Sequence, residues 1–398
     1  MIAHSRPWTL FAVIVLMAPL AAYARNGMAL MPFILAAIIL FQYGFSGLYS
    51  FDKFVLVPTF LLFAWGLISA IWGESSEIDK APILALTAFV GAVVVLSPKK
   101  MSNDDIKHYS KAICIFGIAS AIIFSIQFIF DFPILRLVSH GLVPIGSQGN
   151  ITPLALLVYP VGVALFLERR SKTIGFMFVV IMLIVVSLGP MFAAAAAVYV
   201  ATIIFIASYF FPRLFIAILF STLIIYIITS PLLHKEFVTI EQSHRLPISL
   251  EQTWIHRLGM WTFASGVIAE HPILGVGLRG SRYLGKGQVV EGTELPVMSL
   301  HPHNAALEVW LELGAVGVLL VIGICLGVAR LLWRLRHERL LIAMSCASIA
   351  TFTLISLLSF GLWQLWWQGT IWVTAFIVSL MRRRLNVAGR ELGRTSVA

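Results

Sequence analysis

The chain has 398 residues, of which 60% are hydrophobic and 12% charged, and it carries a net charge of +10. Soluble domains carry about 25% charged residues, and a soluble core cannot bury this much apolar sequence. A bilayer can, because lipid solvates the outer surface of each helix. The composition therefore excludes a soluble protein and predicts an all-α, polytopic membrane protein. Nucleic-acid binding is not expected, because the basic residues lie in short stretches between apolar runs.

Twelve apolar segments are each long enough to predict a membrane-spanning helix. Gly189-Pro190 separates the seventh segment from the eighth, and Pro212-Arg213 separates the eighth from the ninth. The three cysteines lie within apolar runs and are interpreted as packing residues. The predicted spans are 7–24, 28–46, 54–72, 82–97, 109–130, 152–168, 173–188, 190–211, 213–231, 304–332, 339–360 and 363–381.

The distribution of lysine and arginine predicts the orientation of the spans, because basic connections stay in the cytoplasm. With twelve spans, the basic connections fall on one side and both termini are cytoplasmic. The whole chain, 1–398, then forms one integral membrane domain with a single long outer connection at about 232–303. The basic connections contain Lys53, Lys99, Lys100, Arg169, Arg170, Lys172, Arg213, Arg330, Arg334, Arg336 and Arg339, and the tail contains Arg382, Arg383 and Arg384.

The long connection shows helical patterning and two polar motifs. Trp254, Arg257, Leu258 and Trp261 recur at three- and four-residue intervals, which predicts a helix with these residues on one face. The first motif runs from Arg257 through Trp261 to Glu270-His271-Pro272-Ile273-Leu274-Gly275-Val276-Gly277. The second is His301-Pro302-His303-Asn304, followed by Leu307, Trp310, Leu311, Glu312, Gly314 and Gly317.

His303 is expected near the N-terminus of the tenth span, because Pro302 can begin a helix and Asn304 can cap one. The partial positive charge at a helix N-terminus disfavours imidazolium. A neutral His303 can accept a proton near pH 7. The alternative interpretation is that His303 only caps the helix or bonds a carbonyl group.

Together these motifs resemble the O-antigen ligase and O-antigen polymerase superfamily, whose pattern is Arg-x-x-x-Trp, a His-Pro stretch with Gly-x-Gly, and His-x-His-Asn with Leu-Glu-x-Gly-x-x-Gly. All of these elements stand between Arg257 and Gly317, and Gly146-Ser147-Gln148-Gly149-Asn150 is similar to a further Gly/Asn segment of the family. One departure is Ser187-Leu188-Gly189-Pro190, where members often carry Ser-Arg-Gly. A second phosphate-binding arginine, if one is needed, is then sought among Arg136, Arg245, Arg279 and Arg282.

The resemblance implies a GT-C-like glycosyltransferase of the bacterial inner membrane, with a periplasmic active site in the 232–303 loop. It implies an O-antigen ligase that transfers polysaccharide from undecaprenyl pyrophosphate to lipid A–core oligosaccharide, without a cofactor. His303 is expected to act as general base and Arg257 to contact the pyrophosphate. No metal-ligand spacing is seen, so metal-independent catalysis is expected. The expected substrate-binding residues are His301, Asn304, Arg279, Arg136, Arg245 and Trp261.

Three alternative functions remain open at this stage: an O-antigen polymerase, a protein O-oligosaccharyltransferase of the same superfamily, and a lipid or solute transporter. Glu308 and Glu312 lie one turn apart near the outer end of the tenth span, and they are either functional carboxylates or partners of loop arginines. Trp363, Trp366, Trp367 and Trp372 are expected to form a lipid-facing interfacial belt, or alternatively to line a groove for a polyprenyl chain.

Overall fold

The computed structural model describes residues 6–44, 52–73, 81–138, 140, 143, 147–243 and 251–395. Within these residues the chain is α-helical, and its only β-structure is an isolated bridge between Val289 and Pro296. Each of the twelve predicted apolar segments coincides with a helix. These are α1 (Arg6–Tyr23), α2 (Met31–Tyr43), α3 (Lys53–Ser69), α4 (Ala81–Leu96), α5 (Asn103–Ile129), α7 (Thr152–Arg169), α8 (Lys172–Leu188), α9 (Phe192–Phe210), α10 (Pro212–Leu232), α13 (Ala305–Arg334), α14 (Arg339–Leu358) and α15 (Leu365–Thr395).

The all-α membrane class is confirmed by the length and composition of these helices. Among the described residues, seven helices are long and apolar enough to cross a bilayer, and four further apolar helices are shorter. The two proline breaks are also confirmed, because α8 ends at Leu188 before Gly189-Pro190 and α10 begins at Pro212. The number of twelve spans and the sidedness of the chain stay predictions.

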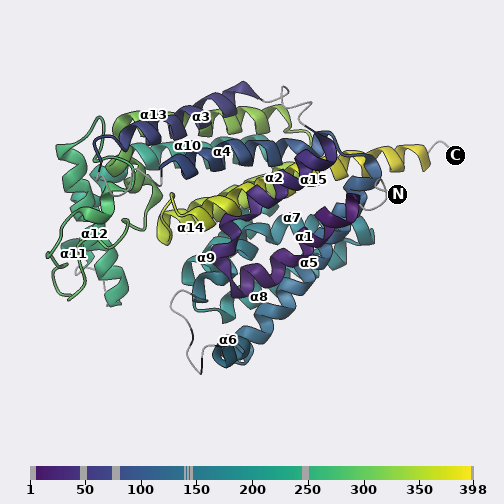
Figure 1. Cartoon of the computed structure of the whole chain (residues 1–398), viewed down its shortest axis with the longest axis horizontal. Helices are drawn as coiled ribbons and strands as arrows, with labels where there is room; N and C mark the ends of the chain where they lie inside the picture. Colours follow the sequence, from purple (N-terminus) through teal and green to yellow (C-terminus); the bar gives the residue numbers. More distant parts are fainter. Residues whose placement is uncertain are drawn as a thin grey trace.

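The helices form one elongated bundle whose two ends differ in character (Figure 1). The N- and C-termini lie at one end, while α12 (Gln252–Glu270) and the short α11 (Ile240–Ser243) lie at the other. The first described part of the long connection is a π-helical turn, Leu233–Phe237, which follows α10 directly. The short α6 (Pro133–Val138) follows α5 at a separate edge of the bundle.

Helix α7 forms the centre of the larger half of the bundle. Its residues from Thr152 to Leu165 are all buried, and the Tyr159 hydroxyl donates to the Val198 carbonyl of α9 at 2.6 Å. Outer helices instead expose large apolar side chains, as at Phe176 on α8, which is 69% exposed. An apolar outer surface of this kind is what a bilayer solvates, so the burial pattern fits the membrane class.

The tryptophan cluster near the start of α15 does not face lipid. Trp363, Trp366 and Trp367 are all buried, and the Trp367 indole donates to the Ser356 hydroxyl at 3.1 Å. The prediction of a lipid-facing belt is therefore wrong for these three side chains. Trp366 and Trp367 pack inside the bundle because α15 is surrounded by α4, α5, α7 and α14, and Trp363, which precedes α15, packs on Phe63 of α3.

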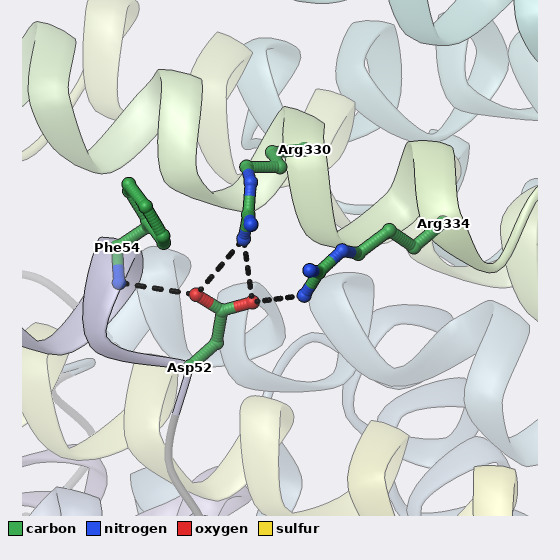
Figure 2. A network of polar contacts seen from close by, with 4 residues as sticks. All are labelled: Asp52, Phe54, Arg330 and Arg334. Carbon is green, nitrogen blue, oxygen red and sulfur yellow. Dashed lines mark hydrogen bonds and ion pairs between the residues drawn. The ribbon is translucent and has the colours of Figure 1, made fainter.

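Helices α3 and α13 pack along each other and are joined at the end of the bundle that lies away from α12 (Figures 1 and 2). Asp52 caps α3 by accepting from the Phe54 backbone N–H at 3.0 Å. The same carboxylate pairs with Arg330 and with Arg334 in the last turns of α13, at 3.3 Å in each case (Figure 2). The contact joins the last turns of α13 to the start of α3, while the first residue of α13 follows the His-x-His-Asn motif at the opposite end of the helix.

Candidate functional site

The predicted loop helix is confirmed as α12, and one face of it packs on the start of α13. Leu258, Trp261 and Ala264 are buried on this face, together with Leu307 and Leu311 of α13. The Trp261 indole donates to the Pro302 carbonyl at 2.7 Å. Trp261 therefore joins α12 to the His-x-His-Asn loop. Its predicted contact with substrate stays a prediction.

The Gly275-Val276-Gly277 stretch inserts into a break in α13. Gly314 interrupts the helix with φ +61 and ψ −163, a conformation that is essentially restricted to glycine. The chain before α13 fills the break with main-chain hydrogen bonds: Val276 N–H to Leu311 O at 2.8 Å and Gly277 N–H to Glu312 O at 2.9 Å. Ala315 N–H in turn donates to Pro272 O at 2.9 Å. The 272–277 segment and the break at Gly314 therefore form one packed joint. Its hydrogen bonds satisfy the carbonyl groups that the broken helix leaves free.

Asn304 is the N-cap of α13, as its residue type predicts. Its side-chain oxygen accepts from Ala306 N–H at 3.1 Å and Leu307 N–H at 3.3 Å. Its amide nitrogen donates to the Tyr226 hydroxyl at 2.6 Å, and that hydroxyl also contacts His234 Nε2 at 3.0 Å. Because both ends of the Asn304 amide are engaged and the residue is 1% exposed, its observed role is to hold the loop.

His303 is oriented by the end of α14. Its Nδ1 contacts the carbonyl oxygen of Ser359, the residue that follows the helix. A carbonyl only accepts, so Nδ1 carries the proton and Nε2 is left with the lone pair. The His303 backbone adopts φ +53, which is rare for a residue with a Cβ. This tautomer is the one required of a general base that acts through Nε2.

His301 is held neutral by two backbone donors. Its Nδ1 accepts from His303 N–H at 3.1 Å, and its Nε2 faces Gly361 N–H at 3.2 Å. A neutral imidazole accepts at one nitrogen only, so the tautomer decides which of the two N–H groups is bonded, and an imidazolium would accept from neither. Burial and the nearby charges of His303 and Arg282 lower the His301 pKa well below its ordinary value. His301 therefore ties the loop to the turn after α14, and its predicted phosphate contact stays a prediction.

Burial also lowers the pKa of His303 to about 4, and the charges of Arg257 and His256 lower it further. The hydrogen bond to Ser359 acts in the opposite direction. At neutral pH the imidazole is therefore uncharged and able to accept a proton. The proposed contact of Arg257 with pyrophosphate stays a prediction.

Two buried carboxylates fix the turns around the histidines. Glu308 accepts from Leu362 N–H at 2.5 Å, in the turn after α14. Glu312 accepts from Arg279 N–H at 2.6 Å and from the Ser281 hydroxyl at 2.5 Å. Each is at most 3% exposed. Their observed contacts are with main-chain N–H groups and a serine hydroxyl, and they align the 279–281 and 359–362 turns with α13.

The predicted arginines do not all meet at the histidines. Arg257 stacks its guanidinium 5.0 Å from the centre of the Trp254 ring, and burial lowers its pKa. Arg279 lies in the turn bound by Glu312, so it belongs to the same site. Arg136 sits on α6, apart from α12, and pairs with Asp131 (Figure 1). Arg245 lies outside the described residues.

One cation near the site was missed by the sequence reasoning. Arg25, in the 3₁₀ turn Arg25–Ala29 between α1 and α2, stacks over Trp366 at 4.2 Å and Phe360 at 5.4 Å from the ring centres. The Arg25 Nε is buried and has no hydrogen-bond acceptor among the described residues. A Cβ at Gly149 would overlap the Arg25 guanidinium, which explains the glycine in the Gly/Asn segment. Arg25 is linked to the histidines through Phe360, which lies between Ser359 and Gly361, the two residues that contact them.

No motif in the chain marks Arg25, because an arginine beside the first apolar run looks like an ordinary flanking charge. The Tyr226–His234 pair was missed for a similar reason, since both residues lie in or next to an apolar helix. A signal was nevertheless present in His234, a lone histidine directly after a predicted span.

Comparisons with known proteins agree with the motif region. The family model described as O-Antigen ligase matches residues 155–322, which include Arg257, His301 and His303. A protein of Rickettsia conorii named "Putative polysaccharide ligase" is 25% identical over 332 residues, covering 81% of this chain and 79% of that protein. One of Rickettsia prowazekii with the same description is 24% identical over 351 residues, covering 86% of this chain and 84% of that protein.

Proposed function

We propose a ligase activity for this chain, whose resemblance to the O-antigen ligase superfamily is confirmed by these matches. The proposed reaction transfers an O-antigen polysaccharide from undecaprenyl pyrophosphate to a hydroxyl of lipid A–core oligosaccharide, at the periplasmic face of the bacterial inner membrane. The 232–303 loop is proposed to lie on that face. The observation that carries the proposal is the orientation of His303, whose Nδ1 bonds to the Ser359 carbonyl and leaves Nε2 free to accept a proton.

In the proposed reaction the acceptor oxygen attacks the anomeric carbon of the donor sugar. The new C–O bond forms as the bond from that carbon to the pyrophosphate oxygen breaks, and the departing oxygen keeps the electron pair. His303 Nε2 takes the proton of the acceptor hydroxyl, a contribution of about 10²–10⁴-fold in rate for general-base catalysis. Undecaprenyl pyrophosphate leaves with the added negative charge.

Arginine side chains are proposed to stabilise that charge, because a planar guanidinium donates two parallel hydrogen bonds to phosphate oxygens. Arg257 is proposed as the first of these, because it stands on α12, whose Trp261 bonds to the Pro302 carbonyl between the two histidines. Arg25 is proposed as the second, since its Nε has no acceptor among the described residues and its aromatic stack holds the fork in place. Pre-positioned donors of this kind cost little reorganisation during the reaction.

The test uses purified full-length protein, undecaprenyl-pyrophosphate-linked glycan and rough lipopolysaccharide, with capped lipopolysaccharide read on a gel. The variants His303→Gly and Arg257→Lys are expected to lose product. Glycine suits the φ of +53 at position 303, so His303→Gly removes the base without straining the backbone. Arg257→Lys keeps the charge but loses the fork.

Matched controls come from the same loop: His271→Ala and Lys286→Ala remove an exposed histidine and an exposed cation. Both are expected to keep full activity. Product that is made equally by His303→Gly contradicts the base assignment. Longer lipid-linked glycan in place of capped lipopolysaccharide changes the assignment to a polymerase, and glycan on a serine or threonine of a protein changes it to a protein glycosyltransferase.

A further inference from the structure

A hollow lies between two helix–helix turns at the end of the bundle far from the histidines. It is formed by the turn from α9 to α10 and the turn from α13 to α14, and its volume is about 530 Å³. Helix α13 has 30 residues, so its far end is about 45 Å from the His-x-His-Asn loop. The hollow is lined by Phe210, Phe211, Pro212, Arg213, Leu214, Arg336, His337 and Arg339.

Three arginines face one another across this hollow without compensating carboxylates. Among the residues that the structure describes, none of Arg213, Arg336 and Arg339 forms an ion pair. Glu338, which precedes α14, is instead within 3.8 Å of Arg382. Arg213 and Arg339 also lie in the first turns of α10 and α14, where the helix dipole disfavours a cation. An anion bound between the two turns offsets both the repulsion among the arginines and their unfavourable interaction with the helix dipoles.

Arg336 is partly immobilised and still has bonding capacity. One of its terminal nitrogens donates to the Trp333 carbonyl at 2.9 Å, and its guanidinium lies 5.9 Å from the centre of the Trp333 ring. Its Nε is buried and has no acceptor within the described part of the chain. A phosphate oxygen is the acceptor that a guanidinium fork favours.

The rim of the hollow is apolar and exposed. Phe210 and Phe211 are 59% and 62% exposed, and Leu214 is 54% exposed. In a membrane protein these side chains contact acyl chains, whereas a water-soluble anion gains nothing from them. The hollow thus combines a cationic interior with a lipid-contacting rim.

From this geometry we propose that the hollow binds the headgroup of an anionic phospholipid. Its phosphate lies against Arg213, Arg336 and Arg339, and its acyl chains run past Phe210 and Phe211. Basic pockets between membrane helices recognise such headgroups by the same charge complementarity. The inference does not depend on the proposed transferase activity.

The test measures lipid binding by the full-length protein in non-ionic detergent, using native mass spectrometry and thermal unfolding. The probes are phosphatidylglycerol, phosphatidylcholine and inorganic phosphate. Phosphatidylglycerol alone is expected to bind tightly and to raise the unfolding temperature. The triple variant R213Q/R336Q/R339Q is expected to bind it on the order of a hundredfold more weakly, since each arginine contributes about fivefold.

The matched control is R169Q/R170Q/K172Q, which removes three charges from the turn between α7 and α8 without touching the hollow. It is expected to bind phosphatidylglycerol like the parent. Equal loss in both triple variants overturns the proposal, because binding then follows net charge alone. Equal stabilisation by inorganic phosphate overturns the choice of a lipid. If the triple variant does not fold, the three single variants decide, and unchanged affinity in all three contradicts the proposal.

Discussion

Substituting Gly314 with alanine tests whether the joint between the two glycine motifs positions the site. Gly314 holds α13 open with φ +61 and ψ −163, and the 272–277 segment is bonded into the gap. A Cβ at this position would overlap the carbonyl group of Ile273. The segment must therefore move away from α13, and it carries Arg279 with it.

The expected cost combines strain and lost hydrogen bonds. The backbone conformation costs a residue with a Cβ about 1–3 kcal/mol. Two or three of the main-chain bonds made by Val276, Gly277 and Ala315 are lost, at about 1 kcal/mol each. The sum is about 3–6 kcal/mol, and for a chain of 398 residues this lowers the unfolding temperature by about 5 °C. Transfer activity is expected to fall on the order of a hundredfold, the usual effect of a displacement of about 1 Å at a reacting site.

Thermal unfolding in detergent and the ligation gel measure the two effects, and two other glycines serve as controls. Gly292 has φ +77 with open space around it, so Gly292→Ala carries only the backbone strain of about 1–2 kcal/mol. Gly266 lies inside α12 with open space, so Gly266→Ala is expected to stabilise the protein by up to about 1 kcal/mol. A Gly314→Ala protein no less stable and no less active than Gly292→Ala refutes the reasoning, because the packed joint would then contribute nothing.

Three further predictions concern the reaction itself. Because the His303 pKa is lowered to about 4, its neutral form persists on acidification. The kcat/KM is therefore expected to stay level from pH 8 to about pH 5 before falling. A fall centred near pH 6.5 contradicts this prediction. Arg25→Gln is expected to raise the KM for the lipid-linked donor by about tenfold or more, with a smaller rise for Arg25→Lys, and an unchanged KM excludes Arg25 from the donor site. A chelator is expected to leave the rate of capping unchanged, and a loss restored by a divalent cation argues for a metal.

The positions of the helices were predictable from the sequence because one physical requirement dominates them. Each apolar run must satisfy its own backbone hydrogen bonds in lipid, so its length and its proline breaks set the helix bounds. Gly189-Pro190 and Pro212 end or begin helices where predicted. Which helices are enclosed was not predictable, because α7 and α8 are similarly apolar and only packing distinguishes them. The buried tryptophans of α15 were misassigned for that reason.

The candidate site was predictable where chemistry depends on side-chain type. His301 and His303 stand in one motif, and their ring centres lie 4.2 Å apart, while α12, which carries Arg257, bonds to the same loop through Trp261. The groups that orient these side chains have no motif in the sequence by which they can be recognised. The Ser359 carbonyl group that accepts the hydrogen bond from His303 Nδ1–H belongs to the main chain, and every residue has such a group. Arg25 is separated from the motif by more than two hundred residues, so only the packing of α15 against the 25–29 turn reveals it.

The Ser359 carbonyl also explains how a histidine with a lowered pKa can serve as a base. Ser359 follows the last turn of α14, where helix carbonyl groups lack intrahelical partners and the dipole is negative. In the proposed reaction His303 becomes an imidazolium when it takes the acceptor proton, and this negative end is directed at its Nδ1–H. Burial and the charge of Arg257 lower the His303 pKa in the empty site. In the proposed reaction the anionic donor offsets the charge of Arg257, so its binding is expected to raise the His303 pKa and to favour proton transfer to Nε2.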